Sequence, residues 1–175
     1  MRKNQVIFIS EALLLGGVGR SKLPHFGYAL PKAEVEELVI ASLREVSCSP
    51  KEAGELARWL NGCKLSEARD KLEQVIEMKT AVPFRRHKKK VPHRKEIQGF
   101  YAGRYPVKAA RLFQKLLDNL ENNATFRGMD PERLKIVHFS VHSGRKIKKY
   151  IPRAFGRATP YFETLVHVEV AAREV

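Results

Sequence analysis

Residues 134–170 read LKIVHFSVHSGRKIKKYIPRAFGRATPYFETLVHVEV. Apolar and polar residues alternate at both ends of this stretch, which is typical of β-strands with one buried face. The alternating positions are Leu134, Ile136 and His138 at the start, and Val166, Val168 and Val170 at the end. Two strands that flank a central segment predict one β-hairpin.

The connection between these strands, residues 144–160, is too long for a tight turn. We expect part of it to continue as strand beyond the core. About ten residues on each side, at about 3.3 Å each, would give an arm on the order of 30 Å long. Pro152 and Pro160 have no amide proton, so they predict an irregular or twisted ladder with a missing donor at Pro152. Gly156 is expected at the tip, because glycine tolerates positive φ.

Upstream of the hairpin, one further strand and a first helix are predicted. Residues 39–47 alternate like a strand from Val39 to Glu45 and on to Ser47. Ser49-Pro50-Lys51-Glu52 then predicts a helix start, with Ser49 as the cap, Pro50 at the first helical position and Glu52 completing a capping box. Asn61-Gly62 is a good stop for this helix.

Two more helices complete the predicted body. The second starts after Leu65, with Ser66 as its cap, and ends near Lys79. The third starts at Pro106 and ends within residues 122–125. The sequence therefore predicts an α+β fold, in which three helices pack on a small antiparallel sheet with a long protruding basic β-hairpin.

The positive charge of the chain is concentrated in two segments. The 175 residues carry 33 Lys or Arg and 19 Asp or Glu, a formal net charge of +14. Residues 85–95 hold seven cations and residues 144–160 hold six, with no acid in either segment, which leaves 20 cations against 19 acids elsewhere. A nearly neutral body with two basic protrusions favours a polyanionic partner, first nucleic acid and second an anionic membrane.

The two basic segments carry the candidate RNA-binding residues. Lys and Arg neutralise phosphates, and Arg does so bidentately. Interleaved aromatic rings either stack on unpaired bases or anchor the segments to the body; they are Phe84, Phe100, Tyr101, Tyr105, Tyr150 and Phe155. The candidates are Arg85, Arg86, Lys88, Lys89, Lys90, Arg94, Lys95, Arg104, Arg145, Lys146, Lys148, Lys149, Tyr150, Arg153 and Arg157.

Motifs for catalysis, metals and cofactors are weak or missing. Residues 16–21, GGVGRS, lack the spacing and the lysine of a phosphate loop. His138 and His142 would share a strand face, but catalytic zinc needs three protein ligands. We expect Cys48 and Cys63 to be small buried residues with reduced thiols. The basic segments contain no carboxylates for a magnesium nuclease. We expect no catalytic residue, no metal and no cofactor.

The sequence also predicts that the protein has no membrane partner and consists of one main domain. No apolar run approaches the roughly 18 residues of a transmembrane helix. Ser10 and Glu11 interrupt the apolar stretch near the start, which argues against a signal peptide. Residues 1–38 are expected to form a weakly ordered N-terminal extension. Residues 39–175 are expected to form a single RNA-binding domain with a basic loop, 80–105, and a hairpin arm, 144–160.

Several motifs match those of one protein family. The most specific is PRAFGRATP at residues 152–160, and the others are ASLREV at 41–46, SPK at 49–51, AVPFRRH at 81–87, HRK at 93–95, FYAGRYPVKAA at 100–110, GRKIK at 144–148 and HVE at 167–169. On these motifs, residues 39–173 resemble large-subunit ribosomal protein twenty-two in its archaeal and eukaryotic branch. The central loop marks that branch, since bacterial members lack it.

The resemblance implies a structural, non-catalytic constituent of the large ribosomal subunit in the cytoplasm. The implied partners are large-subunit rRNA, neighbouring large-subunit ribosomal proteins and the nascent polypeptide. Residues 145–157 would line the nascent-peptide exit tunnel, and the body would lie near the tunnel exit. The residues by themselves leave two alternatives, a free RNA chaperone or RNA-processing enzyme acting on structured RNA, and a polybasic membrane-surface protein.

Overall fold

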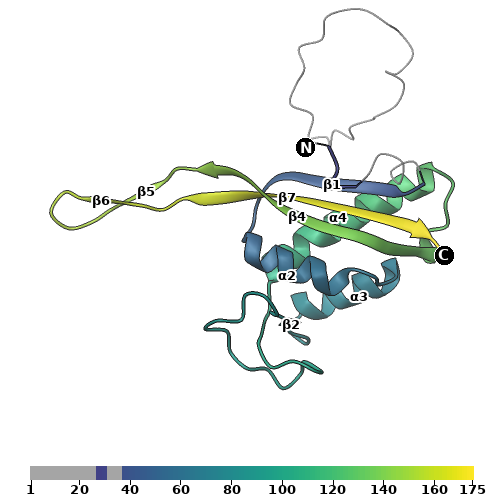
Figure 1. Ribbon diagram of the computed structural model, residues 1–175, viewed down its shortest axis with the longest axis horizontal. Coiled ribbons are helices and arrows are strands. Elements are labelled where there is room, and N and C mark those ends of the chain that lie inside the picture. The colour runs from purple at the N-terminus through teal and green to yellow at the C-terminus, as the bar shows by residue number, and fades with distance from the viewer. Residues whose placement is uncertain (1–26, 31–36) are drawn as a thin grey trace, which may run out of the picture.

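A three-stranded antiparallel sheet forms the centre of the molecule. The computed structural model describes residues 27–30 and 37–175, so most of residues 1–38, for which a weakly ordered extension is expected, lies outside the described residues, GGVGRS included. The strands are β1 (Val39–Ser47), β4 (Leu134–Ile147) and β7 (Glu163–Glu174), in the order β1-β7-β4 (Figure 1). The predicted pairing of residues 39–47 with the base of the C-terminal hairpin is confirmed, because Val39 lies opposite Ala172 and Ser47 opposite Leu165.

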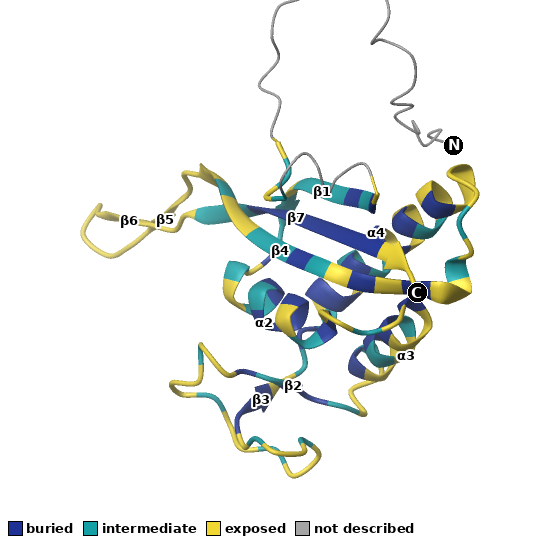
Figure 2. Ribbon diagram, turned by 45° about the vertical axis from the view of Figure 1, so that its right-hand side comes forward, coloured by how far each residue is buried: buried dark blue, intermediate teal, exposed yellow. Residues whose placement is uncertain are grey.

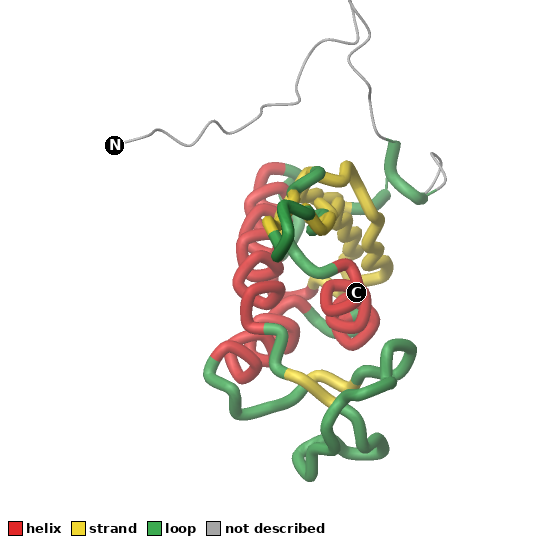
Figure 3. The backbone as a smooth tube through the Cα atoms, turned by 90° about the vertical axis from the view of Figure 1, so that its left-hand side faces the viewer, coloured by secondary structure: helices red, strands yellow, loops and turns green. Residues whose placement is uncertain are grey.

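Three helices cover one face of this sheet (Figure 3). They are α2 (Pro50–Leu60), α3 (Leu65–Ile76) and α4 (Val107–Phe126), and a short 3-10 turn, η1 (Pro131–Arg133), leads into β4. Phe113 of α4 stacks on Phe139 of β4 with ring centroids 5.0 Å apart, at the centre of the core. Val166, Val168 and Val170 of β7 are buried beneath the helices, as their alternation predicts. The predicted α+β architecture is confirmed.

The helix ends differ in detail from the prediction. Ser49 is the N-cap of α2 and Pro50 its first residue, but no side chain bonds at this cap, so the capping box with Glu52 does not form. The N-cap of helix α3 is Lys64, two residues before the predicted cap Ser66, and the helix ends at Ile76 instead of near Lys79. Leu65 is buried and belongs to the core, which draws the helix start back from Ser66. Pro106 caps α4 from outside the helix, which runs on to Phe126.

Three register shifts interrupt the predicted strand alternation, one in the pairing of β1 with β7 and two in the pairing of β4 with β7, of which the second lies between Ser143 and Lys146. The pairing of β1 with β7 shifts between Leu43 and Val46, where Glu45 takes a φ of 52°. The pairing of β4 with β7 shifts between Ile136 and His138, so the buried face passes from Ile136 to Phe139. An extra residue at a β-bulge moves the side chains after it to the other face.

Neighbouring groups occupy the two outer edges of the sheet. The Asn123 side-chain amide donates to the carbonyl of Ile40 at 2.9 Å on the β1 edge, and Arg127 donates to the carbonyl of Leu38 at 2.7 Å. On the β4 edge, the amide of Gly62 donates to the carbonyl of Ile136 at 3.0 Å. Groups that cover an edge strand in this way hinder its pairing with a strand of another molecule. In the part of the chain that the structure describes, no helix is long and apolar enough to cross a membrane.

Candidate nucleic-acid interface

The hairpin of β4 and β7 leaves the body and continues as an arm (Figure 1). Beyond Ile147 and Glu163, which pair with each other, the arm carries a short second ladder of β5 (Tyr150–Pro152) and β6 (Ala158–Pro160). The register is continuous between the two ladders, because Lys146 lies opposite Thr164 and Pro152 opposite Ala158. The predicted extension of the hairpin beyond the core is therefore confirmed.

Both arm prolines occupy positions where no ladder bond is lost. Backbone hydrogen bonds join the Tyr161 amide to the Lys149 carbonyl at 2.7 Å and the Arg153 amide to the Arg157 carbonyl at 2.7 Å, so odd-numbered residues form the hydrogen-bonded pairs. Pro152 and Pro160 lie between these pairs, where an amide would point out of the ladder. The expectation that Pro152 removes a ladder donor is therefore wrong. A proline at such a position blocks pairing with a further strand without weakening its own ladder.

The tip of the arm turns at Phe155 and Gly156. Gly156 has a φ of 67°, as predicted, and Phe155 also takes a positive φ, 59°. A non-glycine residue in this conformation is uncommon. The Phe155 side chain is 95% exposed, so the tip presents an aromatic ring to the surroundings.

The two faces of the arm differ chemically. Side chains alternate across a ladder, so residues paired with each other share a face. Tyr150, Pro152, Ala158, Pro160 and Phe162 share one face, which is apolar towards the tip. The ring of Tyr150 meets that of Phe162 edge-on, with centroids 6.0 Å apart. The opposite face carries Arg153 and Arg157 next to the tip.

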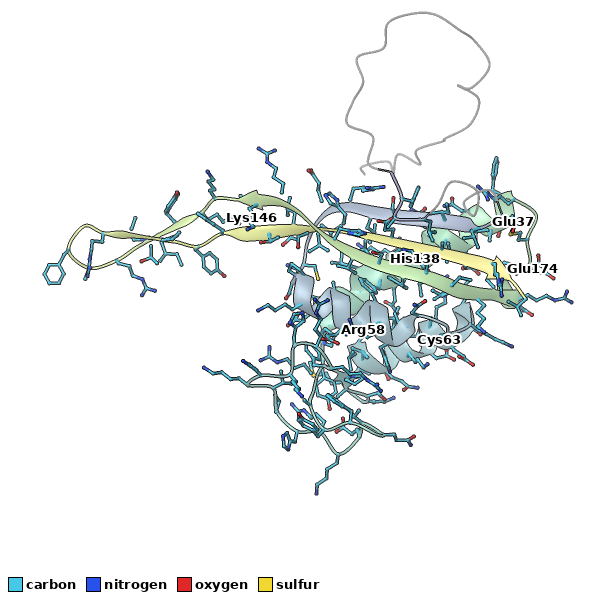
Figure 4. All side chains as sticks on the ribbon, viewed as in Figure 1. Glu37, Arg58, Cys63, His138, Lys146 and Glu174 are labelled. Atoms are coloured by element: carbon cyan, nitrogen blue, oxygen red, sulfur yellow. The ribbon has the colours of Figure 1, made fainter. Side chains whose placement is uncertain are left out.

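Lys149 is the one arm cation with a close acidic partner among the described residues. Its ammonium lies 2.5 Å from the Glu163 carboxylate at the root of the arm, and Glu163 also accepts a hydrogen bond from the Ser47 hydroxyl. The hydrogen bond from Lys149, followed by that from Ser47, lowers the pKa of Glu163. The other five arm cations are exposed and form no ion pair within residues 27–30 and 37–175; they are Arg145, Lys146, Lys148, Arg153 and Arg157. Figure 4 shows side chains along the arm, with Lys146 at its root, pointing away from the ribbon.

The second basic segment is a loop closed by two short strands. Strand β2 (Val82–Pro83) pairs with β3 (Gly103–Arg104), and His93 bridges to Ala102. The loop backbone is closely packed at Gly103. A Cβ at this position would lie 2.2 Å from Ile97 Cδ1 and 3.0 Å from the Val82 carbonyl oxygen. A side chain at position 103 would therefore push the two strands apart.

A buried glutamate of α2 holds the start of this loop. Glu55 is 2% exposed, and its carboxylate accepts hydrogen bonds from three consecutive backbone amides. The donors are the amides of Arg85 at 3.1 Å, Arg86 at 2.8 Å and His87 at 2.9 Å. The bonds fix the backbone while the cationic side chains of Arg85 and Arg86 stay exposed. Sequence analysis missed this residue, since nothing in the pattern of α2 distinguishes Glu55 from a solvated glutamate.

The aromatic rings of the loop divide between the two predicted roles. Phe84 is buried and anchors the loop to the body. Phe100 stacks on Tyr101 at 4.8 Å, and Arg85 lies over the Phe100 ring at 5.8 Å from its centroid. Tyr101 is 46% exposed. The exposed ring and the guanidinium offer a stacking surface for an unpaired base.

Fourteen of the fifteen predicted RNA-binding residues are exposed, and Arg94 is half-buried. Arg94 lies over the Tyr105 ring at 5.1 Å. The fold gathers the fifteen residues on two separate protrusions, the loop below α2 and the arm to the side, which do not meet (Figures 1 and 2). A pocket of about 280 Å³ beside the loop adds Arg58 and Trp59, which sequence analysis did not single out.

His138 and His142 belong to β4, and Cys48 and Cys63 lie in the connections before α2 and α3. His142 lies 2.9 Å from the Glu169 carboxylate, which also accepts the amide of Ala29 at 3.0 Å. His138 Nε2 is buried without a hydrogen-bond partner in the described residues. Cys48 is buried, which raises the pKa of its thiol. In residues 27–30 and 37–175, no group of three or more His, Cys, Asp or Glu side chains could hold a metal ion.

Comparison with known proteins identifies the same family that the motifs suggest. The model of the family described as "Ribosomal protein L22p/L17e" matches residues 41–173. A "Large ribosomal subunit protein uL22" from Thermofilum pendens is 52% identical over 153 residues, which is 87% of this chain and 99% of that protein. The Archaeoglobus fulgidus protein of the same name is 54% identical over 128 residues, 73% of this chain and 83% of that protein.

The similarity reaches upstream of the first strand. The Ignicoccus hospitalis protein, also named "Large ribosomal subunit protein uL22", is 48% identical over 154 residues, 86% of this chain and 97% of that protein. A match to 87% of 175 residues, as for the Thermofilum pendens protein, spans about 152 positions and must include residues 24–38. With most of its length matched by the family model and by archaeal relatives, the chain belongs to the ribosomal protein L22p/L17e family.

Proposed function

We propose that the protein is a structural, non-enzymatic constituent of the cytoplasmic large ribosomal subunit, where loop 80–105 and arm 144–160 bind large-subunit rRNA. In this proposal the arm also lines the nascent-peptide exit tunnel, and neighbouring large-subunit proteins contact the body. The observation that carries it is the charge distribution. Residues 85–95 and 144–160, which lie on the two protrusions, hold 13 cations and no acid, whereas the rest of the chain holds 20 cations and 19 acids.

The shape of the arm supports binding inside a folded RNA. Eight residues on each strand, from Lys146 and Thr164 to the Arg153–Arg157 pair before the tip, reach on the order of 25 Å at about 3.3 Å each. A projection two strands wide enters crevices between RNA helices that a whole domain could not enter. Residues 148–161 are all exposed, so they gain little from the body and much from a surrounding partner.

The difference between the arm faces supports two kinds of neighbour. Arg153 and Arg157 on one face suit phosphates, which arginine contacts bidentately. Tyr150, Phe162 and the two prolines on the other face suit bases or an extended polypeptide, since neither requires positive charge. A tunnel wall has both neighbours, with rRNA behind the arm and the growing chain in front of it.

Sedimentation tests membership of the large subunit. A tagged chain is expressed in an archaeal host, and its lysate is sedimented at low and at high salt. We expect the protein to co-migrate with the large subunit at low salt and to remain there at moderately raised salt. A protein that sediments free of ribosomes at both salt concentrations would contradict the proposal and favour a free RNA chaperone.

Crosslinking tests the tunnel position. A photoreactive amino acid replaces Phe155 at the arm tip, or Phe126 as the control, which is 78% exposed at the end of α4. Ribosomes carrying either variant are stalled with a radiolabelled nascent chain and irradiated. We expect a crosslink to the nascent chain from position 155 and none from position 126. Equal labelling from both positions would argue against the tunnel assignment.

A further inference from the structure

A thiol and a primary amine face each other where α2 passes into α3, outside the two basic protrusions. Cys63 lies in the short connection between these helices, and Lys71 lies in the middle of α3. The Lys71 ammonium donates a hydrogen bond to the Cys63 sulfur, with Nζ and Sγ 2.9 Å apart. Figure 4 labels Cys63 on the body, beside the helices and away from the arm.

The fold holds both groups in place. The Gly62 amide donates to the Ile136 carbonyl at 3.0 Å, and the Ile136 amide donates to the Cys63 carbonyl at 2.9 Å, so the backbone on either side of the sulfur is bound to β4. Lys71 belongs to α3, and its ammonium lies over the Trp59 ring of α2 at 5.6 Å from the centroid. The short distance between sulfur and nitrogen therefore depends on how α2, α3 and β4 pack together.

The surroundings of Cys63 are those of a reactive thiol. Reactive cysteines are partly exposed and lie beside a cation. Cys63 is half-buried, and its nearest cation is the Lys71 ammonium. That ammonium forms no ion pair within the residues that the structure describes, so its close contacts are a sulfur and an aromatic ring.

The other cysteine of the chain has different surroundings. Cys48 is buried and donates only a long hydrogen bond, 3.8 Å, to the Ser49 carbonyl. Burial raises the pKa of its thiol, and a buried thiol of this kind is inert. Cys48 therefore serves as an internal reference for Cys63 in the same molecule.

We propose that Cys63 and Lys71 form a redox-controlled covalent bond, a sulfenamide, which we call the Cys63–Lys71 bridge. The oxidant is a peroxide. One hydrogen peroxide converts the thiol into a sulfenic acid and leaves as water, so the sulfur loses two electrons and the peroxide gains them. The lysine nitrogen then attacks the sulfur, the S–O bond breaks as the S–N bond forms, a second water leaves, and the ammonium proton passes to solvent.

The bridge is reversible and changes the body of the protein while it lasts. Two thiol molecules restore the Cys63 thiol and the Lys71 amine, and they leave as a disulfide. The bond closes a covalent ring over residues 63–71, and a cross-link of this kind stabilises a fold by constraining the unfolded chain. The inference concerns the body alone and is independent of the proposed rRNA binding.

Peptide mapping of the peroxide-treated full chain tests the proposal. The protein is treated with a small excess of hydrogen peroxide, catalase removes the remainder, free thiols are alkylated in denaturant, and trypsin cuts after lysine and arginine. We expect residues 59–64 joined to residues 70–79, because a bridged Lys71 is not cut. The joined mass should be two hydrogens below the sum of the two peptides, and dithiothreitol should separate them. Cys48 should be found as an alkylated thiol.

Two arginine variants make a matched control. Lys71→Arg keeps the positive charge over the Trp59 ring but replaces the amine with a guanidinium, which does not deprotonate in proteins. Lys64→Arg makes the same change at the exposed lysine next to Cys63 in the sequence. We expect Lys71→Arg to lose the bridge, with Cys63 oxidised further to a sulfinic acid, and Lys64→Arg to keep the wild-type yield. Equal yields in the two variants would overturn the assignment to Lys71.

Two further measurements test the contribution of the fold. Treatment with peroxide in guanidinium chloride should lower the yield sharply, because sulfur and nitrogen are no longer held together, and an equal yield would overturn the inference. The bridged chain should melt several degrees above the reduced chain and return to the reduced value with dithiothreitol. A bridged chain that melts no higher, or a wild-type chain whose Cys63 is oxidised without joined peptides, would also overturn it.

Discussion

Glu55 is the residue on which the geometry of the basic loop most depends. Replacing it with Ala leaves three loop amides without their acceptor, and an unsatisfied buried polar group costs about 1–3 kcal/mol. We expect Glu55→Ala to lower the free energy of unfolding by that amount and to speed hydrogen exchange at Arg85, Arg86 and His87. Glu73→Gln on exposed α3 is the control and should change stability by less than about 0.5 kcal/mol. Unchanged exchange in Glu55→Ala would show that the loop is held by other contacts.

Gly103 and Gly54 make a matched pair of glycine substitutions. A Cβ at Gly103 meets Ile97 Cδ1 at 2.2 Å and the Val82 carbonyl oxygen at 3.0 Å, whereas nothing lies within 4 Å of one at Gly54. We expect Gly103→Ala to destabilise the protein by about 1–3 kcal/mol through overpacking. Gly54→Ala should stabilise it by about 0.5–1 kcal/mol, because alanine favours the helix interior of α2. Chemical denaturation of both variants measures the difference, and two changes of the same sign would contradict the account.

Glu163 makes the root of the arm sensitive to acid. Hydrogen bonds from Lys149 and Ser47 lower its pKa, so the folded state favours the carboxylate. The stabilisation is present above the ordinary glutamate pKa of about 4.3 and is lost as the pH falls through the lowered folded value. We expect the Lys149–Glu163 contact to break in that pH range. NMR titration of the Glu163 carboxyl against Glu163→Gln, which cannot titrate there, checks this, and an ordinary or raised pKa would refute it.

At the scale of single elements, sequence periodicity predicted which strands and helices exist but not their irregularities. Val39–Ser47 and Pro50–Leu60 have the predicted bounds. The register shifts at Glu45, before His138 and between Ser143 and Lys146 were not predicted, because an extra residue in a strand depends on the partner strand and leaves no periodic signal. The start of α3 differs from the prediction for a similar reason, because the burial of Leu65 outweighs the capping preference of Ser66.

Within the arm, Arg153 and Arg157 are the cations that should contribute most to phosphate binding. Both are exposed next to the tip, and neither forms an ion pair with any described residue. Arg153→Ala with Arg157→Ala should flatten the salt slope for rRNA binding by up to about 2 and leave thermal stability nearly unchanged. Lys79→Ala with Arg133→Ala, two paired cations of the body, is the control. A large fall in melting temperature would place the two arginines in the fold of the body.

At the scale of the whole molecule, the sequence alone predicted where the positive charge of the candidate site is concentrated. It did not predict which residues hold the charged segments in place. Two acid-free runs stand out in any linear count, and fourteen of the fifteen predicted residues, which lie in these runs apart from Arg104, are exposed. Glu55 could not be singled out from the sequence, because the three backbone amides that it binds belong to residues 30 or more positions away.

The arm should be separable from the body without loss of the fold. Ile147 and Glu163 form a pair at a position equivalent to the hydrogen-bonded pairs of the arm, and a two-residue type I′ turn follows such a pair naturally. Replacing residues 148–162 with Asn-Gly removes Lys148, Lys149, Arg153 and Arg157 but no buried side chain. We therefore expect the shortened chain to keep its helical circular dichroism and nearly its full melting temperature.

The same shortened chain should lose function while it keeps stability. Four fewer phosphate contacts lower the salt slope for rRNA binding by about 3 at about 0.7 to 0.9 each. Loop 80–105 retains its cations, so rRNA binding should weaken and not vanish. A matched chain that keeps the arm but carries Glu163→Gln controls for disturbance of the arm root. If the shortened chain binds rRNA with the wild-type slope, the arm makes no phosphate contacts; if it unfolds, the arm is part of the core and the division into body and protrusions is wrong.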